Sequence, residues 1–158
     1  MQQASTLNGE RVFELRRGEV LVSTDPARLN LDVIHSYLVQ SYWAKGIPRE
    51  TVARAVENSF CFGAYDSAGS QVGFARVISD FATFAYIADV FVLESHRGQG
   101  IGKLLMECIM QHPELQRLRR WTLSTKDAHA LYAKFGFTAL NWPDRYMEIL
   151  QPNIYESV

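Results

Sequence analysis

The segment from Arg97 to Lys103, with glycines at positions 98, 100 and 102, constrains the fold of this chain more than any other feature. A nearly unbroken apolar run, residues 85–93, precedes it, and a stretch with helical periodicity follows it. A strand, a glycine turn and a helix start in this order aim several backbone N–H groups and the positive end of a helix dipole at an anion. Glycine also lets the backbone approach a phosphate closely. The sequence therefore predicts a site for a phosphate or pyrophosphate group.

The spacing within this segment excludes two common phosphate-binding loops. A Walker-type loop requires a glycine five residues before the Gly-Lys pair and a Ser or Thr after it, but Arg97 and Leu104 occupy these positions. A dinucleotide fingerprint requires a third glycine where this chain has Lys103. The pattern that fits is Arg-x-x-Gly-x-Gly, formed by Arg97, Gly100 and Gly102.

This pattern resembles the acetyl-CoA pyrophosphate loop of the GCN5-related N-acetyltransferases (GNAT family). Residues 88–97 resemble the fourth strand of that family as it enters the loop, and residues 130–137 resemble its second signature, a helix with a tyrosine before a Gly-Phe pair. Two motifs in the right order, about thirty residues apart, are far more specific than either motif alone. The resemblance extends from about residue 31 to residue 140.

The resemblance implies an α/β (α+β) fold of the GNAT type. This fold has a mixed, mostly antiparallel central sheet of about six to seven strands, about four flanking helices and a splayed central strand pair. Apolar periodicity predicts the elements individually. We expect strands at residues 11–16, 19–23, 60–66, 71–78, 84–93, 119–125, 137–140 and 146–150, and helices at residues 31–43, 48–58, 100–111 and 128–135. Asn30 or Asp32 is expected to cap the first helix, and a right-handed crossover should join 84–93 to 119–125.

Bulk properties indicate an ordinary soluble protein. The length suits a single acetyltransferase domain over residues 1–158, with residues 1–10 as a candidate flexible start. An apolar content of 47% and a net charge of −1 give no reason to expect nucleic acid or a membrane as a partner. No apolar stretch approaches a membrane span, and the N-terminus lacks signal-peptide features, so we expect a cytoplasmic location. Cys61 and Cys108 make neither a disulfide framework nor a metal site, and no metal is expected. The oligomeric state stays open, with a homodimer as one option.

The resemblance implies acetyl-CoA as the acyl donor. We expect the loop amides to contact the pyrophosphate, and the backbone near residues 91–93 to pair with pantetheine like an added strand. Arg97 either contacts a phosphate or fixes the loop, and both roles stay open. Thr125 stands where many family members carry an Asn, so its contact departs from the family pattern. The predicted cofactor-binding residues are Phe91, Val92, Leu93, Arg97, Gly98, Gln99, Gly100, Ile101, Gly102, Lys103 and Thr125.

Two residues are candidates for catalysis. Tyr132 lies where the family commonly carries its general acid, and a phenol can supply the proton that a departing thiolate needs. Asp89, an acid in an otherwise apolar strand, is the candidate general base; a carboxylate that is only hydrogen-bonded, or that binds the ammonium of the acceptor, is the alternative. His96 and His129 are weaker candidates because each is expected on a solvated face. The cysteines lie in apolar patterns, which disfavours a covalent cysteine mechanism.

The acceptor site is expected around the first two helices and their connection. Tyr37, Tyr42, Trp43 and Phe84 are candidates to line it, with Trp142 closing it from the C-terminal side, although aromatic residues at helical spacing commonly belong to a core. The partners are thus acetyl-CoA and an amine acceptor. The sequence predicts an acetyl-CoA-dependent N-acetyltransferase that acts on a primary amine by direct attack in a ternary complex. The alternative is a non-catalytic acyl-CoA-binding module of the same fold.

Overall fold

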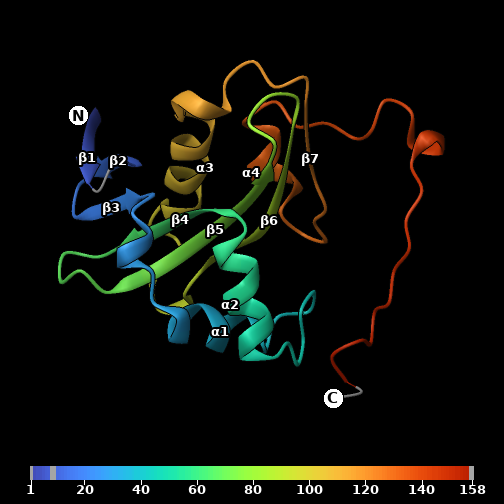
Figure 1. Cartoon of the computed structure of the whole chain (residues 1–158), viewed down its shortest axis with the longest axis horizontal. Coiled ribbons are helices and arrows are strands. Elements are labelled where there is room, and N and C mark those ends of the chain that lie inside the picture. Colours follow the sequence, from blue (N-terminus) through green and yellow to red (C-terminus); the bar gives the residue numbers. More distant parts are fainter. Residues whose placement is uncertain (1, 8–9, 157–158) are drawn as a thin grey trace.

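A seven-stranded β-sheet forms the centre of the structure (Figure 1). The computed structural model describes residues 2–7 and 10–156. The strands lie in the sheet in chain order, and every neighbouring pair is antiparallel except the last, which is parallel. The strands are β1 (Gln2–Leu7), β2 (Glu10–Arg17), β3 (Val20–Ser23), β4 (Phe60–Tyr65), β5 (Gln71–Ser79), β6 (Phe84–Val92) and β7 (Arg120–Leu123).

Helices cover both faces of this sheet. One apolar cluster joins the sheet to α3 and α4, and a second joins it to α1 and α2. The described residues form four α-helices, which confirms the expected mixed α/β fold. They are α1 (Leu31–Leu38), α2 (Arg49–Glu57), α3 (Ile101–Gln111) and α4 (His129–Ala133), and short 3-10 helices lie at η1 (Pro26–Arg28), η2 (Glu94–His96), η3 (Pro113–Leu115) and η4 (Pro143–Arg145).

Helix α3 is the element that anchors the glycine loop to the core. Leu105 and Ile109 on its inner face have no exposed surface. Burial of such a side chain contributes about 2 kcal/mol. The loop that precedes α3 is therefore attached to one of the best-packed parts of the domain.

Strand β6 carries an irregularity at its centre that positions the site. Arg76 on β5 pairs with Ala88, whereas Phe74 pairs with Phe91, so one extra residue of β6 is accommodated between the two pairs. Asp89 lies in this bulge with φ at 37°, in the left-handed region that few non-glycine residues adopt. On its other edge β6 pairs with β7 only over Phe84–Ile87, and the two strands part beyond that point. The expected splayed strand pair is confirmed.

Local signals explain where two helices begin and end. The Asn30 side chain accepts hydrogen bonds from the amides of Asp32 and Val33, so Asn30 is the residue that caps α1. The predicted helix to residue 43 is too long, since α1 ends at Leu38. Its last carbonyl accepts a hydrogen bond from the hydroxyl of Ser41 (2.7 Å), which competes with a further helical turn. Helix α4 likewise ends early, because Gly136, with φ at 91°, turns the chain.

The two strands predicted at residues 137–140 and 146–150 do not form. Both segments lie outside the sheet, and the backbone of 146–150 makes no ladder hydrogen bonds. Alternating apolar residues predict an extended backbone, but a strand also needs a neighbouring strand, which the pattern does not specify.

The prediction of a single domain over residues 1–158, with a flexible start at residues 1–10, stays a prediction. Residues 1, 8, 9, 157 and 158 lie outside the described residues.

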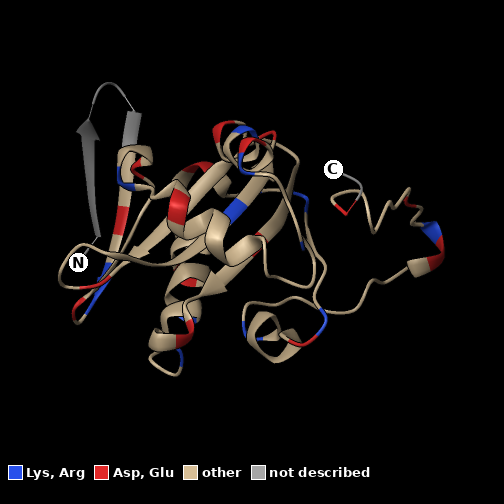
Figure 2. Cartoon of the chain, turned by 90° about the horizontal axis from the view of Figure 1, so that it is seen from below, with Lys and Arg blue, Asp and Glu red and all other residues tan. Residues whose placement is uncertain are grey.

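Among the described residues, no helix combines the length and apolar character that a membrane crossing requires. Basic and acidic residues are interspersed along the chain (Figure 2).

Candidate active site

The glycine loop presents unpaired backbone amides at the start of α3. Gly98 and Gly100 have φ of 77° and 75°, conformations that favour glycine. Gly100 is the N-cap of α3 and provides no side-chain cap, and the first bond of the helix runs from the amide of Leu104 to the carbonyl of Gly100. The amides of Ile101, Gly102 and Lys103 therefore have no intrahelical partner. This arrangement suits an anion, as the sequence predicts.

Gly102 is a glycine that the protein's own packing does not require. A Cβ built there would meet Leu131 at 3.7 Å and Val92 at 3.9 Å, which are ordinary contacts. Its φ is not positive, so backbone strain does not demand glycine either. The remaining physical reason for a glycine in the first turn of α3 is close approach of a ligand to the backbone.

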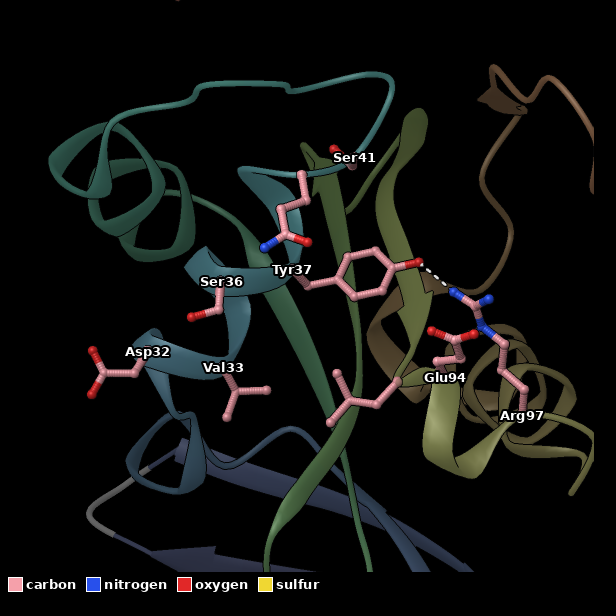
Figure 3. Close-up of a pocket in the computed structure, with 9 residues that line it drawn as sticks. Asp32, Val33, Ser36, Tyr37, Ser41, Glu94 and Arg97 are labelled. Atoms are coloured by element: carbon pink, nitrogen blue, oxygen red, sulfur yellow. Dashed lines mark hydrogen bonds between the residues drawn. The ribbon is translucent and has the colours of Figure 1, made fainter.

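Arg97 fixes the loop to α1 in this structure. Its guanidinium donates one hydrogen bond to the hydroxyl of Tyr37 (3.0 Å) and another from Nε to the carbonyl of Val92 (3.3 Å). Figure 3 shows Tyr37 reaching from α1 to this guanidinium, at one side of a cavity of about 570 Å³. The Tyr37 ring also stacks on Phe91, with centroids 4.0 Å apart. These bonds are those of a residue that fixes the loop, and a contact between Arg97 and a phosphate stays a prediction.

The backbone of β6 divides the predicted pantetheine-contacting residues into two groups. The amide of Leu93 donates to the carbonyl of Val72 on β5 (2.8 Å). Backbone groups of successive residues face opposite edges of a strand, so Phe91 and Leu93 face β5 while Val92 faces the gap beside β7. Val92 is therefore the one of these three residues whose backbone groups face the gap, and its carbonyl already accepts the hydrogen bond from Arg97 Nε.

A second cavity, of about 540 Å³, collects the catalytic candidates. Asp89 from the β6 bulge, Thr125 from the segment after β7 and Tyr132 from α4 all line it. Tyr42 and Trp43, from the connection between α1 and α2, close another side. We call this space the central cavity. The structure thus brings together residues from distant parts of the chain, such as Tyr42 and Tyr132, which are 90 positions apart. Phe84, Trp142 and Tyr37 are not among its lining residues.

Asp89 is held by two side chains. Oδ1 accepts a hydrogen bond from the indole N–H of Trp43, and Oδ2 accepts one from Nε of Arg76, both at 2.8 Å. Arg76 in turn donates to the hydroxyl of Ser59 (3.1 Å). The Asp89 side chain is 11% exposed and Arg76 is 16% exposed, so most of this ion pair is shielded from water. The carboxylate is consequently well oriented, and part of its hydrogen-bonding capacity is already used.

Tyr132 is the most buried of the candidate catalytic side chains. It is 8% exposed and packs edge-on against Phe137, with ring centroids 6.1 Å apart. Burial, and to a smaller extent the nearby Tyr42 and Asp127, raises the pKa of the Tyr132 hydroxyl to about 12. The hydroxyl therefore keeps its proton throughout the neutral range and is available as a hydrogen-bond donor in the central cavity.

The segment after β7 is tied down from two directions. Thr125 Oγ1 accepts a hydrogen bond from the amide of Ala128 (3.0 Å), which caps the turn leading into α4. The amide of Lys126 donates to the hydroxyl of Tyr42 (3.0 Å). Thr125 thus shapes the cavity wall, and its predicted contact with the cofactor stays a prediction.

Sequence reasoning missed Arg76 and Tyr155, which also line this cavity. Arg76 lies in an apolar strand. A charged residue in such a strand, paired with the residue directly before Asp89, could have identified it as a partner of Asp89. Tyr155 reaches the cavity from the C-terminal end of the described chain, and no local pattern signals this return.

Burial raises the pKa of both the Cys61 and the Cys108 thiols to about 12, which agrees with the prediction that neither cysteine is a nucleophile.

Comparisons with known proteins agree on one family. A model of the acetyltransferase (GNAT) domain matches residues 57–139. The acetyltransferase-family protein FG08082 of Gibberella zeae is 34% identical over 138 residues, which cover 75% of this chain and 78% of that protein. A crystal structure assigned to the GNAT family, xcc2953 of Xanthomonas campestris, shares 52% identity with a TM-score of 0.85 and covers 87% of this chain and 97% of its own. A GNAT acetyltransferase of Elizabethkingia anophelis with acetyl-CoA bound has the same fold, with 16% identity, a TM-score of 0.61 and coverage of 85% of this chain and 90% of its own.

Proposed function

Because the chain belongs to the GNAT acetyltransferase family, we propose that it transfers an acetyl group from acetyl-CoA to a primary amine by direct attack in a ternary complex. The observation that carries this proposal is the position of Tyr132. Its protonated hydroxyl lies in a cavity that opens where β6 and β7 part, at the strand that leads into the glycine loop.

The loop residues fit the donor's pyrophosphate. Unpaired amides at Ile101, Gly102 and Lys103 provide hydrogen-bond donors, and the start of α3 adds a favourable dipole. Gly102 leaves room at the backbone for the phosphate oxygens. In this proposal Val92 offers its backbone to the pantetheine arm, which directs the thioester toward the central cavity. When bound, acetyl-CoA supplies the activated acetyl group.

Tyr132 donates its hydrogen bond to the sulfur that leaves. As the bond between the acetyl carbon and sulfur breaks, negative charge develops on a thiolate, and a positioned O–H stabilises it and supplies a proton. Thiols ordinarily have a pKa of about 8.5. A phenol with a pKa of about 12 is a weaker acid than that thiol, so hydrogen bonding to the thiolate is a larger part of the role than complete proton transfer.

Asp89 orients the amine. Each carboxylate oxygen has two acceptor positions, and Trp43 and Arg76 occupy one on each oxygen. The remaining positions face the acceptor's N–H groups, and the proton of the attacking amine leaves through the carboxylate or a water bound to it. Holding the two reactants together in this way supplies much of the rate, because oriented reactants have very large effective molarities.

The Tyr132→Phe variant tests the proposal. CoA affinity measured by calorimetry should stay unchanged, while thiol release with acetyl-CoA and an accepted amine should fall roughly 100-fold, the lower end for a lost acid catalyst. Unchanged turnover would remove Tyr132 from the mechanism. A panel of primary amines with thiol release as readout tests the reaction itself. If CoA binds and no amine causes release, the non-catalytic acyl-CoA-binding function is the better description.

A further inference from the structure

Tyr37 on α1 contacts residues of both the glycine loop and the central cavity. It lines the neighbouring cavity of about 570 Å³ rather than the central cavity itself. Its hydroxyl accepts a hydrogen bond from the Arg97 guanidinium (3.0 Å), and its ring centroid lies 6.3 Å from that of Trp43. Figure 3 shows the side chain reaching from α1 toward Arg97. A side chain in this position can act on the reaction through its neighbours.

The Tyr37 ring is held in place by the core beneath it. It stacks on Phe91 with an interplanar angle of 7° and ring centroids 4.0 Å apart. Phe91 is buried and packs in turn against Phe74, which has no exposed surface. Because side chains in such a close-packed cluster have little freedom, the Tyr37 hydroxyl is presented to Arg97 at a fixed point.

The hydroxyl holds the Arg97 guanidinium without neutralising it. Arg97 makes no ion pair within the described part of the chain. Its side-chain hydrogen bonds go to two uncharged acceptors, the Tyr37 hydroxyl and the Val92 carbonyl. A full positive charge therefore stays beside the unpaired amides at the start of α3, and it raises the potential that an incoming pyrophosphate meets.

The same two bonds leave an acceptor position open on Val92. The hydrogen bond from Arg97 Nε to the Val92 carbonyl is long, at 3.3 Å, and a carbonyl oxygen has two lone pairs. One lone pair thus stays free for an N–H group of the pantetheine arm. Two hydrogen bonds from one rigid, planar guanidinium also define its orientation, so Arg97 is fixed before the donor arrives.

We propose that Tyr37 is a positioning residue for the donor and that it sets the affinity of this chain for CoA through Arg97. The identity of the donor rests on the proposed function. Tyr37 itself does not touch the donor; it orders the cation that attracts the phosphates. Without the hydroxyl, the long Arg97 side chain is free to move and has to be ordered again when CoA binds, which lowers the affinity.

The Tyr37→Phe variant tests this inference with CoA as the probe. Phenylalanine keeps the ring on Phe91, so the melting temperature should not change. The CoA dissociation constant measured by calorimetry should rise about tenfold, because a hydrogen bond to a charged group is lost. Native CoA affinity in this variant overturns the inference.

Tyr146→Phe is the matched control. It removes another hydrogen bond between an arginine and a tyrosine hydroxyl, from Arg120 to Tyr146 (2.6 Å). Arg120 pairs with Phe84, at the opposite end of β6 from the glycine loop. The control should therefore keep native CoA affinity, and an equal loss of affinity in both variants overturns the inference.

A double-mutant cycle shows whether the Tyr37 hydroxyl acts through Arg97. Arg97→Met removes the guanidinium and keeps an unbranched side chain. In that background Tyr37→Phe should change CoA affinity by less than about twofold, because the bond is already absent. A loss of about tenfold in both backgrounds would show that the hydroxyl acts without Arg97 and overturns the inference.

Turnover separates this inference from the proposed function. With an accepted amine, Tyr37→Phe should raise the KM for acetyl-CoA about tenfold and keep kcat near the native value, since the reacting atoms are not touched. A lower kcat at native KM overturns the inference. A native chain that binds CoA but acetylates no amine contradicts the proposed reaction, while the affinity measurements still decide the role of Tyr37. A native chain that does not bind CoA overturns both.

Discussion

The glycine loop and the central cavity are assembled in opposite ways. The loop is one continuous segment, residues 97–103, between a strand and a well-buried helix. The central cavity combines the α1–α2 connection, the β6 bulge, the segment after β7 and helix α4. Two hydrogen bonds join these parts across the chain, from Trp43 to Asp89 and from Lys126 to Tyr42, over 46 and 84 residues.

Because of this difference, we expect substitutions in the two regions to affect different properties of the protein. A change in the loop alters a local backbone shape and should affect donor binding with little effect on folding. A change in the central cavity alters a contact between distant segments, and should affect stability and turnover while the loop still binds CoA.

The largest effect is expected from Asp89→Ala. Removing one partner of a largely buried ion pair leaves Arg76 without a counter-charge, which costs about 3 kcal/mol in the free energy of unfolding. Urea denaturation measures this loss, and calorimetry should still detect CoA binding by the folded fraction. Asp89→Asn is the matched control, because its amide oxygen can still accept from Trp43 and Asn tolerates positive φ. Equal stability of the Ala variant and the native chain would contradict the ion-pair argument.

Alkaline pH should weaken both halves of the core at once. Cys61 belongs to the cluster under α1 and α2 and Cys108 to the cluster under α3, and burial raises each thiol's pKa from 9.0 to about 12. Above pH 9 the thiols ionise in the unfolded chain but not in the folded one, so stability falls as pH rises until about pH 12. Between pH 8 and pH 10 the expected loss is about 1.4 kcal/mol for each thiol.

Cysteine variants separate the two contributions. Cys61→Ala and Cys108→Ala should each remove about 1.4 kcal/mol of the loss between pH 8 and pH 10, whatever their effect on stability at pH 8. Denaturation curves at both pH values give the comparison. A slope unchanged in both variants would show that other groups cause the alkaline loss.

Gly102→Ala should separate ligand binding from folding. The added methyl group has space within the protein and alanine favours a helix, so the melting temperature should not fall. CoA affinity should fall about tenfold, or about 1.4 kcal/mol, because the methyl group obstructs close approach to the backbone. Gly73→Ala is the opposite case: its Cβ would lie 3.2 Å from the carbonyl oxygen of Phe91, so it should lower stability. Native CoA affinity in Gly102→Ala would remove the phosphate from the first turn of α3.

The smallest effect is expected from Tyr42→Phe. It removes the acceptor for the Lys126 amide at an exposed position, which is worth about 0.5 kcal/mol. Hydrogen exchange at Lys126 should become faster while exchange in α3 stays the same. Slower or unchanged exchange at Lys126 would show that this contact does not hold the segment after β7.

Sequence patterns predicted the elements most reliably where a local cause was present. Asn30 caps α1, Asp66 accepts the amides of Ala68 and Ser70 in the turn between β4 and β5, and the loop glycines adopt positive φ. The errors are also informative. The helix after Asn30 is shorter than predicted because of one serine hydroxyl, and residues 137–140 and 146–150 have strand-like composition without strand partners.

The sequence by itself determined the family, the order of the elements and the glycine loop, because each of these depends on residues close together in the chain. Only the tertiary structure decided that Asp89 is held by Trp43 and Arg76, that Arg97 fixes the loop through Tyr37, and that residues 146–150 lie outside the sheet. The first two features are contacts between distant segments, and the third is the lack of such a contact. Such contacts depend on how whole layers pack and on which strand edges meet, and no local spacing encodes that.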